Sequence, residues 1–366
     1  MRIALYAPFK PLDHPEPSGD RTIGRLLEQS LRGAGHEVFA PSRLRTRWIH
    51  LQPRRWPAAA AAAFAARRTS REHRLDLWLT YLSYYKSPDL LGPWIARSLD
   101  VPYVIFQGAY ATKYRKRLAT WPGFVLNRRA LQAADLVTAN KQVDRENLLR
   151  LLPEDKVLYV PPGVETGLFP RDPTAKEGLR AALGLGDAPV IASAAMMRRD
   201  VKAESLELLF RALAAVDRDF RLLLAGDGPM RPCLEKLACE LLGERVRFLG
   251  RVPREQLHEV FNAADIFAYP GLGESLGMVY LEAQCAGLPV AACDSRGALE
   301  TVAHGETGLL SPLGDAGALA ASIEGLLADA GLREAMGRAA TRRVRERFDA
   351  ARNMQRFLDA VQRLSR

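Results

Sequence analysis

The sequence predicts an α/β protein with two doubly wound parallel sheets, and three observations lead to this class. Short apolar runs bounded by turns alternate with helical patterns along the chain. The same alternation restarts in the second half, after a stretch rich in proline and glycine. The length of 366 residues exceeds one ordinary core, so two domains of roughly 150 to 200 residues are expected.

The first domain is expected over residues 1–160. It opens with the strand MRIALYAP, followed by a helix from about residue 21 to 32 that ends at Gly33-Ala34-Gly35. Strands buried on both faces of a parallel sheet read as short apolar runs. Four such runs predict the remaining strands, at residues 36–40, 75–82, 101–107 and 134–140.

The second domain is expected over residues 171–345. Prolines and glycine mark a break in residues 156–171, and residues 161–170 are interpreted as the linker. The strand pattern restarts at residues 188–195 and returns at residues 266–269. Apolar residues at helical spacing in residues 346–366 predict a final helix that packs back across the first domain.

Composition indicates a globular, soluble protein, with 48% hydrophobic and 26% charged residues. No apolar run approaches the roughly 18 to 20 residues that span a bilayer, and the first apolar stretch is too short for a signal peptide. We therefore expect a cytoplasmic location. The four cysteines show no metal-ligand spacing and are expected to be buried thiols: Cys233, Cys239, Cys285 and Cys293.

Positive charge is confined to the first half. Residues 1–160 hold 26 Lys/Arg against 14 Asp/Glu, a net of +12, whereas residues 161–366 hold 26 against 28, a net of −2. The basic stretches 43–57 and 113–117 also contain tryptophan or tyrosine, which suits an anionic membrane surface or an anionic acceptor. The alternative is a solvated basic face without a partner. No nucleic-acid-binding motif accompanies the charge, so we expect no nucleic-acid partner.

The stretch 269–310 carries the most specific pattern. A glycine-rich turn after an apolar run opens a helical pattern from Met278 to Ala286. Two carboxylates lie around this turn, Glu274 in the loop and Glu282 on the helix. Unpaired amides at a helix N-terminus attract phosphate. Glu282 lies about 7.5 Å along the helix from Gly277, so the carboxylates can accept hydrogen bonds from ribose and hexose hydroxyls. The expected phosphate-side contacts are Ser275, Leu276, Gly277, Met278 and Val279.

Alone, this pair of glutamates is more typical of an ordinary βα unit with two solvated carboxylates, but the surrounding motifs are more specific. Glu274 and Glu282 are followed by AGLPV at 286–290, then by Gly297 and Glu300. Upstream stand LLLAGDGP, VRFLGRVP and FNAADIFAYP, in that order. Across most of residues 190–310 the chain thus resembles the retaining glycosyltransferases of family 4, whose signature is E-x7-E followed by A-x-G-x-P-V.

The resemblance implies the two-domain GT-B fold. Ligands of doubly wound sheets bind at the carboxyl ends of the strands. Two facing Rossmann-like domains are therefore expected to enclose a cleft, with the nucleotide-sugar donor on the second domain and a hydroxyl acceptor on the first. The resemblance also implies a C-terminal helix that crosses back to the first domain.

Further donor-binding residues are implied by the resemblance. Family members carry an Arg and a Lys after the first strand of the second domain, and Lys202 matches the lysine. Met196 stands at the arginine's position, so Arg198 or Arg199 is expected to replace it; both are otherwise solvated loop charges. Gly19 matches a family glycine that approaches the donor phosphate, with a simple turn glycine as the alternative.

The expected catalytic residues are Glu274, Lys202 and Gln107. Many relatives carry a histidine at the end of the strand at 103–106, where this chain has Gln107, which can position a hexose hydroxyl but cannot titrate. Loops on the same side of the first sheet supply the acceptor candidates, which are Asp20, Arg21, Tyr84, Tyr85, Lys86, Lys113, Tyr114 and Arg115.

The family scheme needs neither an enzymic nucleophile nor a cofactor, because the leaving diphosphate helps to deprotonate the acceptor on the same face of the sugar. No metal is therefore expected. The only DxD string, Asp217-Arg218-Asp219, is interpreted as a polar turn.

Two other functions fit the same fold. One is a sugar-nucleotide epimerase or hydrolase, and the other is a non-catalytic binder of nucleotide sugars. A nicotinamide dehydrogenase is disfavoured, because no GxGxxG follows the first strand.

Overall fold

The computed structural model describes residues 1–13 and 19–364 and contains two compact units. Unit 1 comprises Met1–Pro161 and Ala351–Arg366, and unit 2 comprises Pro162–Ala350. Each unit is built on one six-stranded sheet whose neighbouring strands all pair in parallel within the described residues. The predicted α/β class with two parallel sheets is confirmed.

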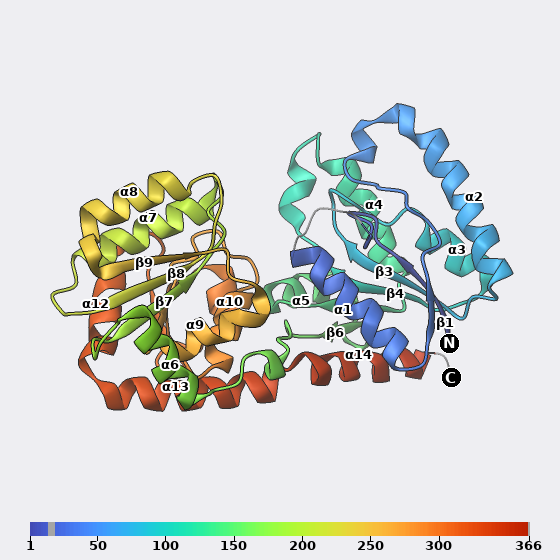
Figure 1. Cartoon of the computed structure of the whole chain (residues 1–366). Helices are drawn as coiled ribbons and strands as arrows, with labels where there is room; N and C mark the ends of the chain where they lie inside the picture. The colour runs from blue at the N-terminus through green and yellow to red at the C-terminus, as the bar shows by residue number, and fades with distance from the viewer. Residues whose placement is uncertain (14–18, 365–366) are drawn as a thin grey trace. The chain divides into compact units, whose positions relative to one another are not determined.

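The sheet of unit 1 has the strand order β2-β1-β3-β4-β5-β6 (Figure 1). Its strands are β1 (Arg2–Tyr6), β2 (Glu37–Phe39), β3 (Leu77–Ser83), β4 (Tyr103–Gly108), β5 (Leu136–Ala139) and β6 (Val157–Tyr159). Its helices are α1 (Gly19–Gly33), α2 (Trp56–Glu72), α3 (Gly92–Leu99), α4 (Trp121–Ala133), α5 (Gln142–Leu149) and α14 (Ala350–Leu364).

Alternate residues of these strands feed two separate cores, one on each face of the sheet. Ile3 and Leu5 pack with residues of α1 and α14, whereas Ala4 and Tyr6 pack with residues of α2, α3 and α4. The ring of Phe357 on α14 meets Phe106 of β4 edge-on, at 4.8 Å between centroids. The C-terminal helix therefore completes the core of unit 1.

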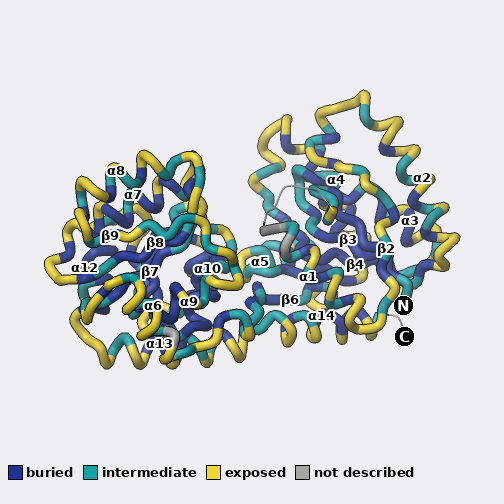
Figure 2. Tube along the Cα trace, viewed as in Figure 1, coloured by how far each residue is buried: buried dark blue, intermediate teal, exposed yellow. Residues whose placement is uncertain are grey.

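The sheet of unit 2 has the order β12-β11-β10-β7-β8-β9 and a single apolar core. Its strands are β7 (Val190–Ala194), β8 (Arg221–Ala225), β9 (Val246–Gly250), β10 (Ile266–Ala268), β11 (Val290–Cys293) and β12 (Gly308–Ser311). Its helices are α6 (Pro173–Leu183), α7 (Val201–Ala214), α8 (Arg231–Leu242), α9 (Leu257–Ala263), α10 (Met278–Cys285), α11 (Arg296–Thr301), α12 (Ala316–Ala328) and α13 (Ala330–Arg347). Figure 2 shows the inner strands of both sheets buried, whereas the edge strands β2, β6 and β9 are partly exposed.

Three details differ from the sequence expectations. The break at 156–171 contains the strand β6, and its later residues Val164 and Phe169 are fully buried in the core of unit 2. The final helix begins at Ala350, because α13 continues to Arg347. The expectation of four buried cysteines was wrong for Cys233 and Cys239, which are exposed because the buried stripe of α8 is formed by other residues, Leu234, Ala238 and Leu242.

Candidate functional site

The glycine-rich turn of unit 2 joins β10 to α10. Gly271 and Gly277 adopt φ of +63° and +74°, a region that side chains with a Cβ rarely occupy. A Cβ on Gly277 would also lie 2.6 Å from the carbonyl oxygen of Gly297 on α11. The Gly297 amide donates to the carbonyl oxygen of Glu274 at 3.0 Å. The two glycines thus let the turn and α11 approach closely.

The Glu274 carboxylate lies against the amides for which the sequence predicts a phosphate. Its Oε1 accepts hydrogen bonds from the backbone N–H of Ser275, Leu276 and Gly277 at 3.2, 3.4 and 3.3 Å. These distances exceed the usual 2.9–3.0 Å of such bonds. The carboxylate therefore stands where an anion would bind, held by long bonds. Met278 and Val279 form the start of α10 itself.

Lys202 lies beside the same carboxylate. It sits in the first turn of α7, which Asp200 caps by accepting from the Lys202 amide at 2.9 Å. The Lys202 Nζ lies 3.7 Å from Glu274 Oε2. The turn rests on α7 through a hydrogen bond of 3.0 Å from the Leu272 amide to Ser205 Oγ. Folding thereby brings together two predicted site residues from different βα units.

Glu282 is buried, with 8% of its surface exposed, and one arginine holds it. Arg254 Nε donates to Glu282 Oε1 at 3.0 Å, and the same guanidinium donates through Nη1 to Glu165 at 2.9 Å. Burial raises the pKa of Glu282 above its ordinary value, and the charge and hydrogen bond of Arg254 oppose that rise. This carboxylate, one of the two predicted to bind the donor, is thus fixed in place by a charged partner.

The two arginines expected to replace Met196, Arg198 and Arg199, are exposed on the loop before α7. Among the described residues Glu274 forms an ion pair with Lys202 and with neither arginine. Their role toward the donor stays a prediction.

In unit 1, Gln107 stands at the carboxyl end of β4 in a strained conformation. Its φ is +64°, and Leu82 on the neighbouring strand β3 has a φ of +63°. The two residues lie between the paired positions Tyr81–Phe106 and Ser83–Gly108. Non-glycine residues adopt this region at a cost of about 1 to 2 kcal/mol. Such strain concentrates at functional sites, so the carboxyl edge of β3 and β4 is a candidate functional site.

An aromatic cluster lies at the same carboxyl edge, on the loops after β3 and β4. The rings of Tyr85 and Tyr114 stack at 3.5 Å between centroids, and Tyr84 meets Tyr85 edge-on at 5.9 Å. Lys86 Nζ lies 5.7 Å from the Tyr85 ring, and Lys113 Nζ lies 5.2 Å from the Tyr114 ring. Burial and the hydrogen bond with Tyr114 raise the pKa of Tyr85 to about 12.

The other acceptor candidates are placed less fully. Arg115 is exposed in the loop after β4, and Arg21 lies in the first turn of α1. Gly19 opens α1, whereas the side chain of Asp20 lies outside what the structure describes. No residue of the described ranges joins a group of three or more His, Cys, Asp or Glu able to hold a metal. Within the DxD string, Asp219 pairs with Arg221 at 2.7 Å.

Sequence reasoning missed Arg254 and Glu165. They lie 28 and 117 residues before Glu282, so no local spacing connects the three. It also missed Trp48 as part of the aromatic cluster, although Lys86 Nζ lies 5.5 Å from its ring. Trp48 falls within a basic stretch singled out above, which was the available signal.

The chain matches two family models, "Glycosyl transferase 4-like domain" over residues 22–163 and "Glycosyl transferases group 1" over residues 180–343. It is 37% identical over 222 residues to a GDP-mannose-dependent alpha-(1-6)-phosphatidylinositol monomannoside mannosyltransferase of Mycolicibacterium smegmatis. That match spans 57% of this chain and 57% of the relative's length. The chain is also 32% identical over 312 residues to a D-inositol 3-phosphate glycosyltransferase of Xylanimonas cellulosilytica, covering 78% and 73% of the two.

Among solved structures, Anabaena HepE in complex with UDP aligns with a TM-score of 0.76 at 19% identity. The alignment covers 99% of this chain and all of that one, which shows a common fold. Both family models and the inositol phosphate glycosyltransferase point to the same family. The GT-B architecture and the signature motifs expected from the sequence agree with it. This chain belongs to glycosyltransferase family 4.

Proposed function

We propose that this chain transfers a sugar from a nucleoside-diphosphate sugar to a hydroxyl acceptor. The observation that carries the proposal is the convergence of Lys202, Glu274 and the amides of residues 275–277 at the start of α10. Amides and a lysine complement a pyrophosphate, and the two carboxylates complement sugar hydroxyls. The names of the two relatives, both glycosyltransferases, support the same activity.

In the proposed reaction the donor diphosphate takes the position of the Glu274 carboxylate on the amides. Glu274 then turns to the hydroxyls of the transferred sugar, and Lys202 pairs with the phosphate it faces. Glu282, fixed by Arg254, accepts from the ribose hydroxyls. The Gln107 amide can hydrogen-bond a sugar hydroxyl but cannot transfer a proton, since an amide does not titrate.

We further propose that the configuration of the anomeric carbon is retained. The bond from that carbon to the diphosphate oxygen breaks, and the acceptor oxygen bonds to the carbon on the same face. The acceptor proton passes to the departing phosphate oxygen. The amides and Lys202 stabilise the charge that grows on the leaving group, so the scheme requires no metal. Full activity after treatment with EDTA is the expected result.

The acceptor is proposed to bind the aromatic cluster of unit 1. Stacked rings such as Tyr85 and Tyr114 offer flat apolar faces, and the ammonium groups of Lys86 and Lys113 add positive charge. This combination suits a sugar or inositol ring that carries a phosphate. The acceptor named for the mycobacterial relative, a phosphatidylinositol mannoside, has that chemistry.

Unit 1 is also proposed to rest on an anionic membrane surface. Leu118 and Trp121 are 94% and 52% exposed, and Leu51 is 49% exposed on an adjoining loop. The two loops meet where the ring of His50 lies 3.2 Å from the Ala119 carbonyl oxygen. Basic side chains adjoin these apolar ones, including Arg54, Lys113, Arg115, Lys116 and Arg117. No helix in the described part of the chain is long and apolar enough to cross a bilayer.

Two experiments test the proposed function. A thermal-shift panel of nucleoside diphosphates and their sugars should identify a donor, because a ligand that binds only the folded chain raises its melting temperature. Incubation with that donor and candidate acceptors should then yield a glycosylated product. Turnover of donor without acceptor would indicate an epimerase or hydrolase instead, and saturable binding without any turnover would indicate a binder.

The membrane proposal has its own test. Sedimentation with vesicles of phosphatidylglycerol and phosphatidylcholine should recover the chain in the pellet. The Leu118→Ser and Trp121→Ser variants should stay in the supernatant, and vesicle binding that these changes leave intact would contradict the proposal.

A further inference from the structure

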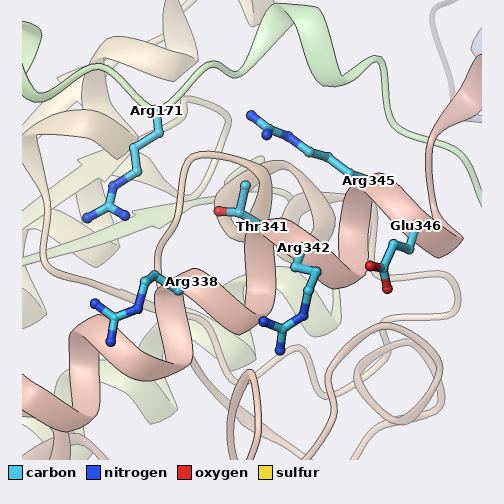
Figure 3. A pocket seen from close by; sticks show the side chains of 6 residues that line it. All are labelled: Arg171, Arg338, Thr341, Arg342, Arg345 and Glu346. Atoms are coloured by element: carbon cyan, nitrogen blue, oxygen red, sulfur yellow. The ribbon is translucent and has the colours of Figure 1, made fainter.

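Four arginines gather around a hollow of about 450 Å³ in unit 2, away from the proposed donor site (Figure 3). Arg338, Arg342 and Arg345 come from α13, together with Thr341 and Glu346. Arg171 comes from the segment before α6 and lines the same hollow. The residues of α13 are spaced i, i+4 and i+7, so their side chains share one side of the helix.

Most of this charge lacks a partner in the part of the chain that the structure describes. Arg338 forms an ion pair with Glu334 at 2.6 Å. In the described residues Arg171, Arg342 and Arg345 form no ion pair, and all three are exposed. Like charges at i, i+4 spacing destabilise a helix by a few tenths of a kcal/mol per pair. The arrangement thus concentrates positive charge on one hollow, in which Glu346 is the one acidic residue of the lining.

Close backbone packing fixes the base of the hollow. A Cβ on Gly337 of α13 would collide with the carbonyl oxygen of Gly287, the glycine that follows α10 with a φ of +87°. The Arg171 Cδ lies 3.1 Å from the Cβ position of Gly287. Thr341 Oγ1 donates to the Gln284 carbonyl oxygen at 3.3 Å. Glycine at both positions therefore brings α13 and the stem of Arg171 to the same turn.

The hollow is distinct from the donor site, because the two lie at opposite ends of α10. The amides that Glu274 contacts precede Met278, whereas Gly287 follows Cys285. At about 1.5 Å per residue, the eight residues of α10 separate them by about 12 Å along the helix. Neither Lys202 nor Glu274 lines the hollow.

We propose that this hollow binds a small anion with several phosphate groups, such as a condensed phosphate or the phosphate chain of a nucleotide. Guanidinium groups match phosphate oxygens with paired N–H donors. Four arginines, with Glu346 in the lining and Glu334 paired to Arg338, leave a net charge of about +2 to +3, which corresponds to an anion of two or three negative charges. The volume exceeds what one phosphate fills and lies within the range of small-molecule sites.

A lipid headgroup carries the same phosphate chemistry, but the surroundings favour a soluble anion. None of the exposed large apolar residues in the described ranges lies on α13. Apolar side chains beside the basic ones are what a bilayer-seated helix needs, and unit 1 has them around Leu118 and Trp121.

Isothermal titration of the full chain with sodium tripolyphosphate, at about 0.15 M salt, tests the proposal. The Arg342→Gln/Arg345→Gln double variant should bind at least tenfold more weakly, since each exposed charged contact contributes a factor of about three to five. The Lys202→Ala variant should retain this binding event, because its charge lies at the donor site. Arg211→Gln, which removes an exposed arginine of α7, is the matched control and should leave the affinity unchanged.

Three results would overturn the proposal. The first is the absence of saturable binding, which would mean that the arginines only complement the negative end of α13. The second is binding lost in Lys202→Ala but kept in the double variant, which would assign the anion to the donor site. The third is equal weakening by Arg211→Gln. Thermal melts of each variant show that it is folded, and vesicle sedimentation that the double variant leaves unchanged would support a soluble ligand over a lipid.

Discussion

The Glu274 carboxylate accepts from the amides at the start of α10, so its negative charge should weaken the binding of a nucleoside diphosphate. Its oxygens should strengthen the binding of the complete sugar nucleotide, because they can accept from the sugar hydroxyls. Its Oε1 receives three backbone N–H groups and its Oε2 faces Lys202. A diphosphate must displace the carboxylate from both partners. In Glu274→Gln the competing negative charge is gone. The affinity of this variant for a nucleoside diphosphate should therefore rise. The ratio of its affinity for the sugar nucleotide to its affinity for the nucleoside diphosphate should fall below that of the parent chain.

The magnitude follows from the geometry. Unit charges about 4 Å apart attract by about 4 kcal/mol at an effective dielectric constant of 20, and Lys202 Nζ lies 3.7 Å from Glu274 Oε2. Both side chains are partly exposed, at 26% and 21%, so screening and side-chain entropy leave about 1 kcal/mol. At 1.4 kcal/mol per factor of ten, the Kd of the nucleoside diphosphate should fall roughly fivefold. Loss of a charged hydrogen bond to the sugar should lower kcat/KM about tenfold to a hundredfold.

Titration calorimetry with GDP and UDP, together with steady-state kinetics on the matching sugar nucleotide, measures both effects. Glu244→Gln is the matched control, since this exposed carboxylate lies in the turn before β9, at the amino edge of the sheet. Its variant should behave as the parent chain in both assays. If Glu274→Gln bound the nucleoside diphosphate tenfold more weakly, the carboxylate would be a required part of the phosphate site, and the displacement argument would be refuted.

Three further changes have defined outcomes. Burial would raise the pKa of Asp265, but hydrogen bonds from Lys176 and the Val190 amide, with the nearby charges, hold that pKa below its ordinary value. Asp265→Asn should therefore lower the free energy of unfolding by about 3 kcal/mol at pH 7, and urea titrations should show this deficit vanishing as the pH falls through the folded pKa. Gln107→Val should have a free energy of unfolding about 1 to 2 kcal/mol lower than Gln107→Gly, because a β-branched side chain tolerates a positive φ poorly and glycine tolerates it freely. Equal midpoints of urea unfolding for the two variants would contradict the proposed backbone strain. Arg254→Ala should raise the donor KM about tenfold or more, whereas Arg254→Lys should restore part of the loss by keeping a charge near the donor helix; an unchanged KM for both would remove Arg254 from the site.

Much of the fold was accessible from the sequence because parallel strands have a strong local signal. Each predicted run in unit 1 coincides with a strand, as 101–107 does with β4, and the helix predicted from Met278 is α10. The turn before α10 was accessible for the same reason, since glycines and a following helical pattern are local features. β6 was not separated from the break around it, because only three residues form it between prolines.

The contacts of the site side chains were not accessible. The sequence predicts unpaired amides at the start of α10, but the Glu274 side chain folds back and accepts from those of Ser275, Leu276 and Gly277. The pairing of Arg254 with Glu282 depends on how α9 and α10 pack, which no spacing reports. The positive φ of Gln107 arises from its register against Leu82, a property of two strands together.

One guanidinium serves both the segment by which the chain enters unit 2 and the buried carboxylate of α10. Arg254 directs one N–H group at Glu165 and another at Glu282. In the proposed donor complex, a ribose hydroxyl that donates to Glu282 meets a carboxylate whose Oε1 already accepts from Arg254. Any weakening of that bond would leave more of the guanidinium charge to Glu165, so binding of the proposed nucleotide and anchoring of the entry segment would be coupled through Arg254.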